Sequence, residues 1–207
     1  MKKHLLSLTA FCVMMLSLAP LEAKGALRVD IMNPGQNTVN LALASPLTGP
    51  DRQATGMGAQ LQKIVEQNLS FLPFVRLTDP RAVLGGTVLN AWEPPALDFK
   101  RFQIAGSDIL ITTYWPKGDS GTAPVQMRAF ETNSGGRLFG KEYPRVNAGD
   151  LPEVADRFCA DLLEALTGNG DFFRSTLAFI KKSGKMAANV WLVKPTGRDL
   201  RQITNMP

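Results

Sequence analysis

The 207-residue sequence predicts an α+β fold in which two main helices pack on one side of a mixed β-sheet. Two segments carry apolar residues at helical spacing, one near the start of the domain and one near its end. Between them lie runs rich in β-branched and aromatic residues, separated by turn-forming residues. Because strands and helices mix along the chain, one layered α+β domain accounts for most of the length.

The first predicted helix spans residues 55–72. Its apolar residues recur at intervals of three and four: Met57, Leu61, Ile64, Val65, Leu69 and Leu72. This stripe forms one face of an amphipathic helix and is expected to pack on the sheet.

The second predicted helix begins after Asp150 and ends at Gly168. Asp150 is a good N-cap residue, Glu153 completes a capping-box pattern, and Pro152 suits the first turn. The expected buried face consists of Val154, Phe158, Leu162 and Leu166.

Strands are expected at residues 27–31, 39–43, 109–115, 125–132 and 137–144. Turn residues separate the first two strands at 33–35 and the last two at 133–136. A short helix is expected around Phe99, Phe102 and Ile104, before Gly106.

After Gly170 the pattern changes to short strands alone, at residues 176–181, 189–194 and 201–204. Short strands at regular spacing with turn signals are typical of one propeller blade or of part of a sandwich. A single such unit cannot bury both of its faces.

The amino terminus predicts export. Lys2 and Lys3 precede an apolar run from Leu5 to Leu18, and small residues follow Pro20. The run is shorter than the roughly 20 residues of a membrane-spanning helix, so we expect a cleavable signal peptide over residues 1–23. No cysteine is placed for lipid attachment, and the expected location is therefore the periplasm.

Composition argues against an enzyme, a metal site and a nucleic-acid groove. Without residues 1–23 the chain keeps 21 basic and 17 acidic side chains, a net charge of +4, and the basic residues are scattered. The sole histidine, His4, belongs to the signal segment, so imidazole-dependent catalysis and metal ligation are excluded. Cys159 is the one remaining cysteine and is expected to be a small, half-buried helix residue.

Other catalytic motifs are missing as well. The sequence has no G-x-S-x-G, and Gly56-Met57-Gly58 lacks the rest of a phosphate-binding loop. We therefore expect no cofactor. A small-ligand or envelope-assembly binding module is the alternative function, with Trp92, Tyr114 and Trp115 as pocket-lining candidates, although aromatics beside a sheet usually belong to the core.

The order of segments from Leu27 to the end resembles the TolB family of the Tol-Pal envelope system. The matching segments are 27–31 with Gly35 and Leu41-Ala42-Leu43; Phe99, Phe102, Gly106 and Asp108 before the strand at 109; Leu166-Thr167-Gly168 with Phe173 and 176–180; and 189–193 through 204. Departures from the family pattern occur at 44–47, at Asp171 and at Thr176.

This resemblance implies a non-enzymatic periplasmic adaptor that supports envelope integrity and constriction at division. It implies that the leading segment binds the inner-membrane protein TolA, here Leu27, Arg28, Val29, Asp30 and Ile31. Strand addition would supply the affinity, and the alternative is that this segment is an edge strand of its own sheet.

The resemblance also implies a division of the chain. Residues 24–170 would form the amino-terminal domain and residues 171–207 the first strands of an incomplete propeller blade, with an inter-domain hinge at Leu166, Thr167, Gly168 and Phe173. Because the family's propeller binds the lipoprotein Pal, we expect a shortened chain of this kind to lack Pal binding.

Overall fold

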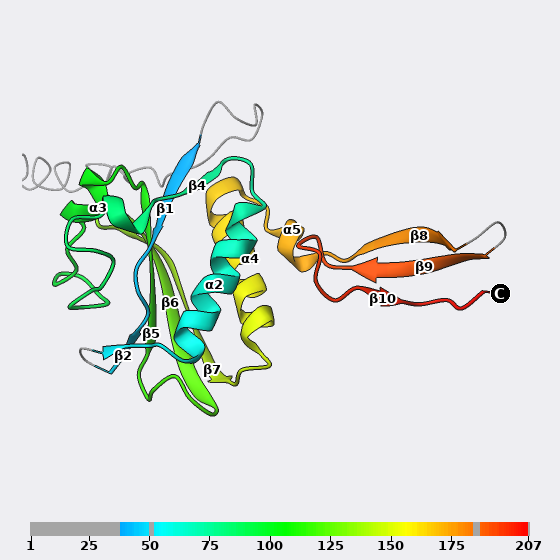
Figure 1. Cartoon of the computed structure of the whole chain (residues 1–207). Helices are drawn as coiled ribbons and strands as arrows, with labels where there is room; N and C mark the ends of the chain where they lie inside the picture. Colours follow the sequence, from blue (N-terminus) through cyan, green and yellow to red (C-terminus); the bar gives the residue numbers. More distant parts are fainter. Residues whose placement is uncertain (1–37, 50–51, 184–186, 207) are drawn as a thin grey trace, which may run out of the picture.

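The structure is a computed structural model that describes residues 38–49, 52–183 and 187–206. The expected signal peptide and the expected strand at 27–31 lie outside these residues. The described chain forms a seven-stranded mixed sheet with helices, followed by a separate three-stranded antiparallel sheet (Figure 1).

The centre of the large sheet is β5 (Ile109–Trp115), which is buried along almost its whole length. It pairs in parallel with β1 (Val39–Leu43) and with β2 (Leu47–Thr48), and antiparallel with β6 (Ala123–Glu131). The hairpin from β6 to β7 (Arg137–Val146) closes one edge, as the turn residues at 133–136 predict. The strand assignments at 39–43, 109–115, 125–132 and 137–144 are thus confirmed within a few residues.

At the opposite edge lies β4 (Val75–Leu77), which pairs in parallel with β1 and was not expected from the sequence. Its three residues form too short a run to show a strand period. The two-residue β3 (Arg52–Gln53), which pairs with β2, escaped prediction for the same reason.

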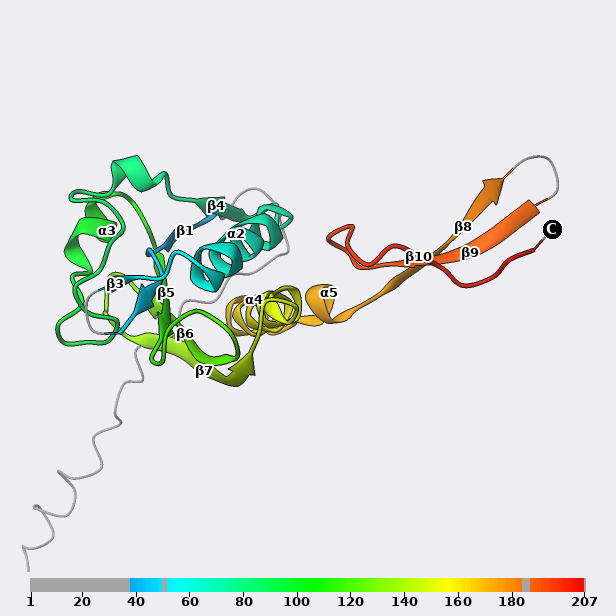
Figure 2. The same ribbon diagram turned by 60° about the horizontal axis from the view of Figure 1, so that its bottom comes forward.

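Two helices, α2 (Met57–Ser70) and α4 (Leu151–Thr167), lie side by side on one face of this sheet (Figure 2). The apolar stripe of α2 is buried, apart from the partly buried Ile64, and Cys159 is completely buried rather than half-buried. The predicted buried face of α4 is confirmed: Val154, Phe158, Leu162 and Leu166 all belong to the core.

The other face of the sheet is covered by the short helix α3 (Lys100–Ile104), by the 3-10 turn η1 (Pro80–Ala82) and by the segment between them. Phe102 is fully buried here beside Leu110 of β5 and Phe130 of β6. The two main helices thus share one side, as expected, whereas the short helix α3 lies on the other side, because both faces of β5 carry apolar side chains that need cover.

The helix boundaries at Asp150 and Gly168 are confirmed, but the capping box is not formed. Asp150 has helical backbone angles, and its carboxylate accepts a hydrogen bond from the Asn147 amide at 3.0 Å. Glu153 forms an ion pair with Arg157 instead of reaching back to the cap. Gly168 ends the helix with φ +82°, a left-handed conformation that glycine adopts without strain.

Beyond the short helix α5 (Asp171–Arg174), the strands β8 (Leu177–Ser183), β9 (Ala187–Val193) and β10 (Arg201–Gln202) form the small sheet in the order β10-β9-β8. The predicted strands are confirmed, with shifted ends. Several large apolar residues remain exposed on and beside this sheet, including Leu177, Phe179, Ile180 and Ile203.

Candidate interaction site

The predicted TolA-facing residues Leu27, Arg28, Val29, Asp30 and Ile31 lie outside the described residues, so the structure does not test them. It does describe the strand that follows them in the sequence. Both edges of β1 are occupied, by β4 over Val39–Leu41 and by β5 over Leu41–Leu43.

The segment predicted as a hinge connects α4 to the small sheet. Leu166 and Phe173 are both buried in the core between the helices and the large sheet. The Thr167 hydroxyl donates to the Leu163 carbonyl at 2.8 Å, inside the last turn of α4. Beside them, Gly170 leaves no space for a side chain, because an added Cβ would lie 2.4 Å from the Ala160 carbonyl oxygen.

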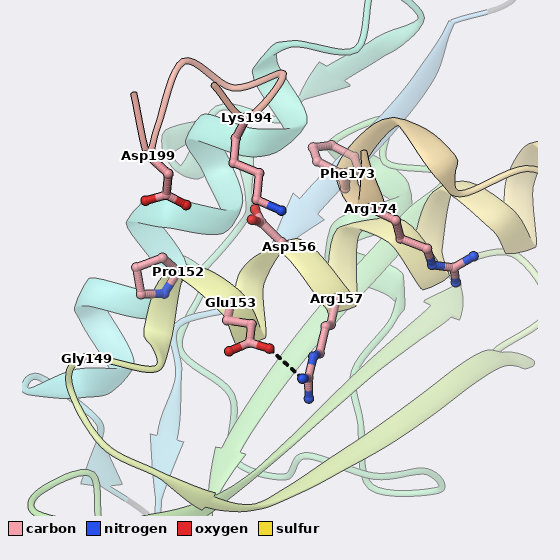
Figure 3. Close-up of a pocket in the computed structure, with 9 residues that line it drawn as sticks. All are labelled: Gly149, Pro152, Glu153, Asp156, Arg157, Phe173, Arg174, Lys194 and Asp199. Atoms are coloured by element: carbon pink, nitrogen blue, oxygen red, sulfur yellow. Dashed lines mark hydrogen bonds and ion pairs between the residues drawn. The ribbon is translucent and has the colours of Figure 1, made fainter. Parts of the chain in front are cut away.

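A cleft of about 490 Å³ lies where α4 faces this connection and the turn after β9 (Figure 3). Most of its lining residues are charged: Gly149, Pro152, Glu153, Asp156, Arg157, Phe173, Arg174, Lys194 and Asp199. Three of these side chains are acidic and three are basic, so the cleft has no dominant sign of charge.

Ion pairs neutralise most of these charges. Arg174 contacts Asp161 at 3.0 Å and also Glu164, and Glu153 contacts Arg157. Lys194 and Asp199 form no ion pair within the described part of the chain. Asp199 has a left-handed backbone conformation, φ +57°, which aspartate tolerates better than most residues.

Sequence reasoning missed one contact at the edge of this cleft. Arg198, in the turn after β9, forms an ion pair with Asp156 of α4 and donates to the Asn68 side chain of α2 at 3.3 Å. Arg198 and Asn68 are 130 residues apart, and no local pattern marks either residue.

The aromatic residues proposed for a ligand pocket pack against other protein groups. Trp115 is completely buried. Trp92 and Tyr114 stack with ring centroids 4.3 Å apart, and the Arg128 guanidinium lies over Trp92 at 3.7 Å. Burial lowers the pKa of Arg128, which the ion pair to Glu93 at 2.7 Å opposes.

The described residues hold no group of three or more His, Cys, Asp or Glu side chains that could bind a metal ion. Burial raises the pKa of the Cys159 thiol well above its usual range, so this cysteine stays protonated and a poor nucleophile. No helix in the described part of the chain has the length and apolar character to cross a membrane.

Comparison with known proteins identifies the family. Over 186 residues the chain is 54% identical to the Tol-Pal system protein TolB of Nitratidesulfovibrio vulgaris. The matched region covers 89% of this chain and 42% of that protein. The Tol-Pal system protein TolB of Desulfosudis oleivorans is 27% identical over 180 residues, covering 85% of this chain and 40% of that protein. The chain belongs to the TolB family.

A solved structure has the same fold. The crystal structure of TolB from Acinetobacter baumannii matches 80% of this chain and 38% of that chain, with a TM-score of 0.59 and 15% sequence identity. No protein-family model matches the sequence. The chain spans less than half the length of the curated relatives it matches and corresponds to the amino-terminal part of TolB.

Proposed function

We propose that this chain is a non-enzymatic, periplasmic adaptor of the Tol-Pal system, which supports envelope integrity and outer-membrane constriction at division. The observation that carries the proposal is the 54% identity to a TolB protein over 186 residues. The buried, protonated Cys159 and the ion pairs of the cleft support the non-enzymatic part of the proposal.

Within this function, residues 27–31 bind a TolA-like inner-membrane protein by strand addition. The support for this assignment is the resemblance of residues 27–31, with Gly35 and Leu41-Ala42-Leu43 after them, to the first strand pair of the TolB family. In strand addition, backbone hydrogen bonds provide affinity and alternate side chains provide selectivity. Leu27, Val29 and Ile31 would face one side, and Arg28 and Asp30 the other.

The test removes one backbone hydrogen-bond donor from residues 27–31 without shortening the segment. Val29→Pro removes one N–H group and fixes φ, whereas Val29→Thr keeps a β-branched side chain and the amide. For binding to the TolA carboxy-terminal domain, we expect Val29→Pro to weaken the affinity by about tenfold or more, equivalent to roughly 1.4 kcal/mol.

Val29→Thr, the matched control, should stay within about threefold of the unchanged chain, or roughly 0.7 kcal/mol. Equal affinity of the proline variant and the unchanged chain, measured by titration calorimetry, would rule out strand addition through this segment.

Export to the periplasm is a second part of the proposal, supported by Lys2, Lys3 and the apolar run that follows. We expect cleavage after Ala23 and a mature amino terminus at Lys24. Intact-mass spectrometry of the protein from the periplasmic fraction measures this directly. A mass that includes residues 1–23, or one that carries acyl chains, is incompatible with this form of export.

The last part of the proposal concerns the small sheet. Strands β8 to β10 are proposed as the start of a propeller blade, and their exposed apolar side chains support this because a blade buries both faces against its neighbours. Residues 1–207 on their own are then expected to bind the TolA-like partner and not a Pal-like lipoprotein.

A further inference from the structure

Three side chains from separate elements meet beside the cleft. Asn68 lies near the end of α2, Asp156 in the second turn of α4, and Arg198 in the turn after β9. The Asn68 amide donates to Asp156 Oδ1 at 2.9 Å, and Arg198 Nη2 contacts both Asp156 Oδ1 and Asn68 Oδ1. Each member therefore interacts with the other two.

This network is largely shielded from solvent. The Asp156 side chain is 13% exposed and the Arg198 side chain 27% exposed, and Asn68 is 1% exposed. Water and salt screen such a pair less than they screen exposed charges. Loss of the guanidinium would leave a carboxylate and an amide oxygen with unmet hydrogen-bonding capacity in a poorly hydrated place.

The turn that carries Arg198 holds the guanidinium in place. The Lys194 amide donates to the Arg198 carbonyl at 2.8 Å, and the Gly197 amide donates to the Lys194 carbonyl at 2.8 Å. Arg198 Nε also donates to the Thr196 hydroxyl at 3.2 Å. Because the turn and the side chain are both constrained, little conformational entropy is lost when the network forms.

The network joins parts of the chain that otherwise share few polar contacts. Within the described residues, no other hydrogen bond or ion pair joins residues 187–206 to residues 38–167. The covalent connection between them is residues 168–176, of which Phe173 is buried in the core and Arg174 pairs with acidic residues of α4, so that Ser175 and Thr176 are the part left free to bend. The angle between the small sheet and the helix pair therefore depends strongly on Arg198.

We propose that Arg198 is a latch that fixes the small sheet against the α2–α4 pair through Asp156 and Asn68, so that opening this network releases the joint at Ser175 and Thr176. Release would separate Lys194 and Asp199 from Pro152 and Glu153, which lie on opposite sides of the cleft in Figure 3. The latch thus sets both the orientation of β8–β10 and the width of the cleft. The proposal does not depend on which partner binds residues 27–31.

The test measures the distance between the two parts by electron spin resonance with paired labels. Labels are placed at Lys63→Cys on α2 and Lys182→Cys on β8, both exposed positions, in the full chain carrying Cys12→Ser. Cys159 can remain, because it is completely buried and will not react in the folded protein. Without further changes we expect one narrow distance distribution.

With Arg198→Ala, the width of the distribution should at least double while the circular dichroism spectrum stays that of a folded protein. Arg201→Ala is the matched control, since Arg201 is an exposed arginine of the same sheet and should leave the width unchanged. Asp156→Asn, which keeps the size of the side chain and removes its charge, should broaden the distribution as well.

If Arg198→Ala does not fold, the Asp156→Asn result decides. Narrow distributions in every folded latch variant would overturn the proposal, and so would equal broadening by Arg201→Ala.

Discussion

At the scale of single residues, burial determines which side chains can ionise. The Tyr143 hydroxyl, on β7, is buried and has no hydrogen-bond partner in the described part of the chain. Burial is the main cause that raises the pKa of this phenol well above its usual range, and the nearby Asp161 adds to the effect. The folded protein therefore keeps Tyr143 protonated at pH values where a free tyrosine ionises.

This difference predicts an alkaline loss of stability. Below the unfolded-state pKa of about 10, Tyr143 is protonated in both states and the pH has no effect through it. Above that pH the unfolded chain loses the proton and the folded chain retains it, so the free energy of unfolding falls by up to about 1.4 kcal/mol per pH unit.

Tyr143→Phe isolates this contribution. The variant should be at least as stable as the unchanged protein at pH 8, because it removes a buried hydroxyl without a partner. At pH 11 the free energy of unfolding of the variant should exceed that of the unchanged protein by about 1 kcal/mol more than it does at pH 8. Urea unfolding at both pH values tests this, and a stability difference independent of pH would refute the assignment.

At the scale of elements, a loop completes a helix. The N-cap of helix α2 is Gly56, which has no side chain to cap the helix, and the first turn contains no acidic residue. Asp119, in the β5–β6 loop, supplies the missing cap and the missing negative charge. Its carboxylate accepts hydrogen bonds from the Gly56 amide at 2.7 Å and from the Gly58 amide at 3.2 Å. The loop therefore stabilises α2 and fixes its start against the sheet.

Asp119→Ala should lower the free energy of unfolding by about 1 kcal/mol, within the usual range for loss of a helix cap of roughly 0.5 to 2 kcal/mol. Ser120→Ala, at an exposed neighbouring position in the same loop, should change it by less than about 0.5 kcal/mol. Chemical unfolding of both variants measures the two values. Similar effects of the two substitutions would mean that Asp119 does not cap the helix.

The same scale shows what sequence patterns can and cannot predict. The long periodic segments that became α2, α4 and β5 were predictable because many residues carry each signal. Strand β4 was not, because three residues paired with β1 leave no periodic trace. The capping box at Asp150 failed because the turn at Asn147 uses that carboxylate, and local motifs do not reveal such competition.

The candidate site was harder to predict than the fold. Residues 27–31 were chosen by resemblance to TolB and remain a prediction. The Arg198 network joins residues of α2, α4 and the turn after β9, and such contacts exist only once the chain has folded. Single-sequence reasoning finds periodic burial, whereas a lone polar residue gives no sign of its distant partner.

At the scale of the whole molecule, we propose that different partners bind to different parts of TolB. Residues 27–31 are proposed to bind a TolA-like protein, and Pal binding belongs by resemblance to a propeller of which the described residues include three strands at most.

The most direct measurement is a parallel calorimetric titration of the 207-residue chain with purified TolA and Pal domains. We predict a dissociation constant on the order of micromolar for TolA, because ordering a binding segment costs entropy, and no detectable heat with Pal. Tight binding to Pal, or no binding to TolA, would contradict this division of partner binding.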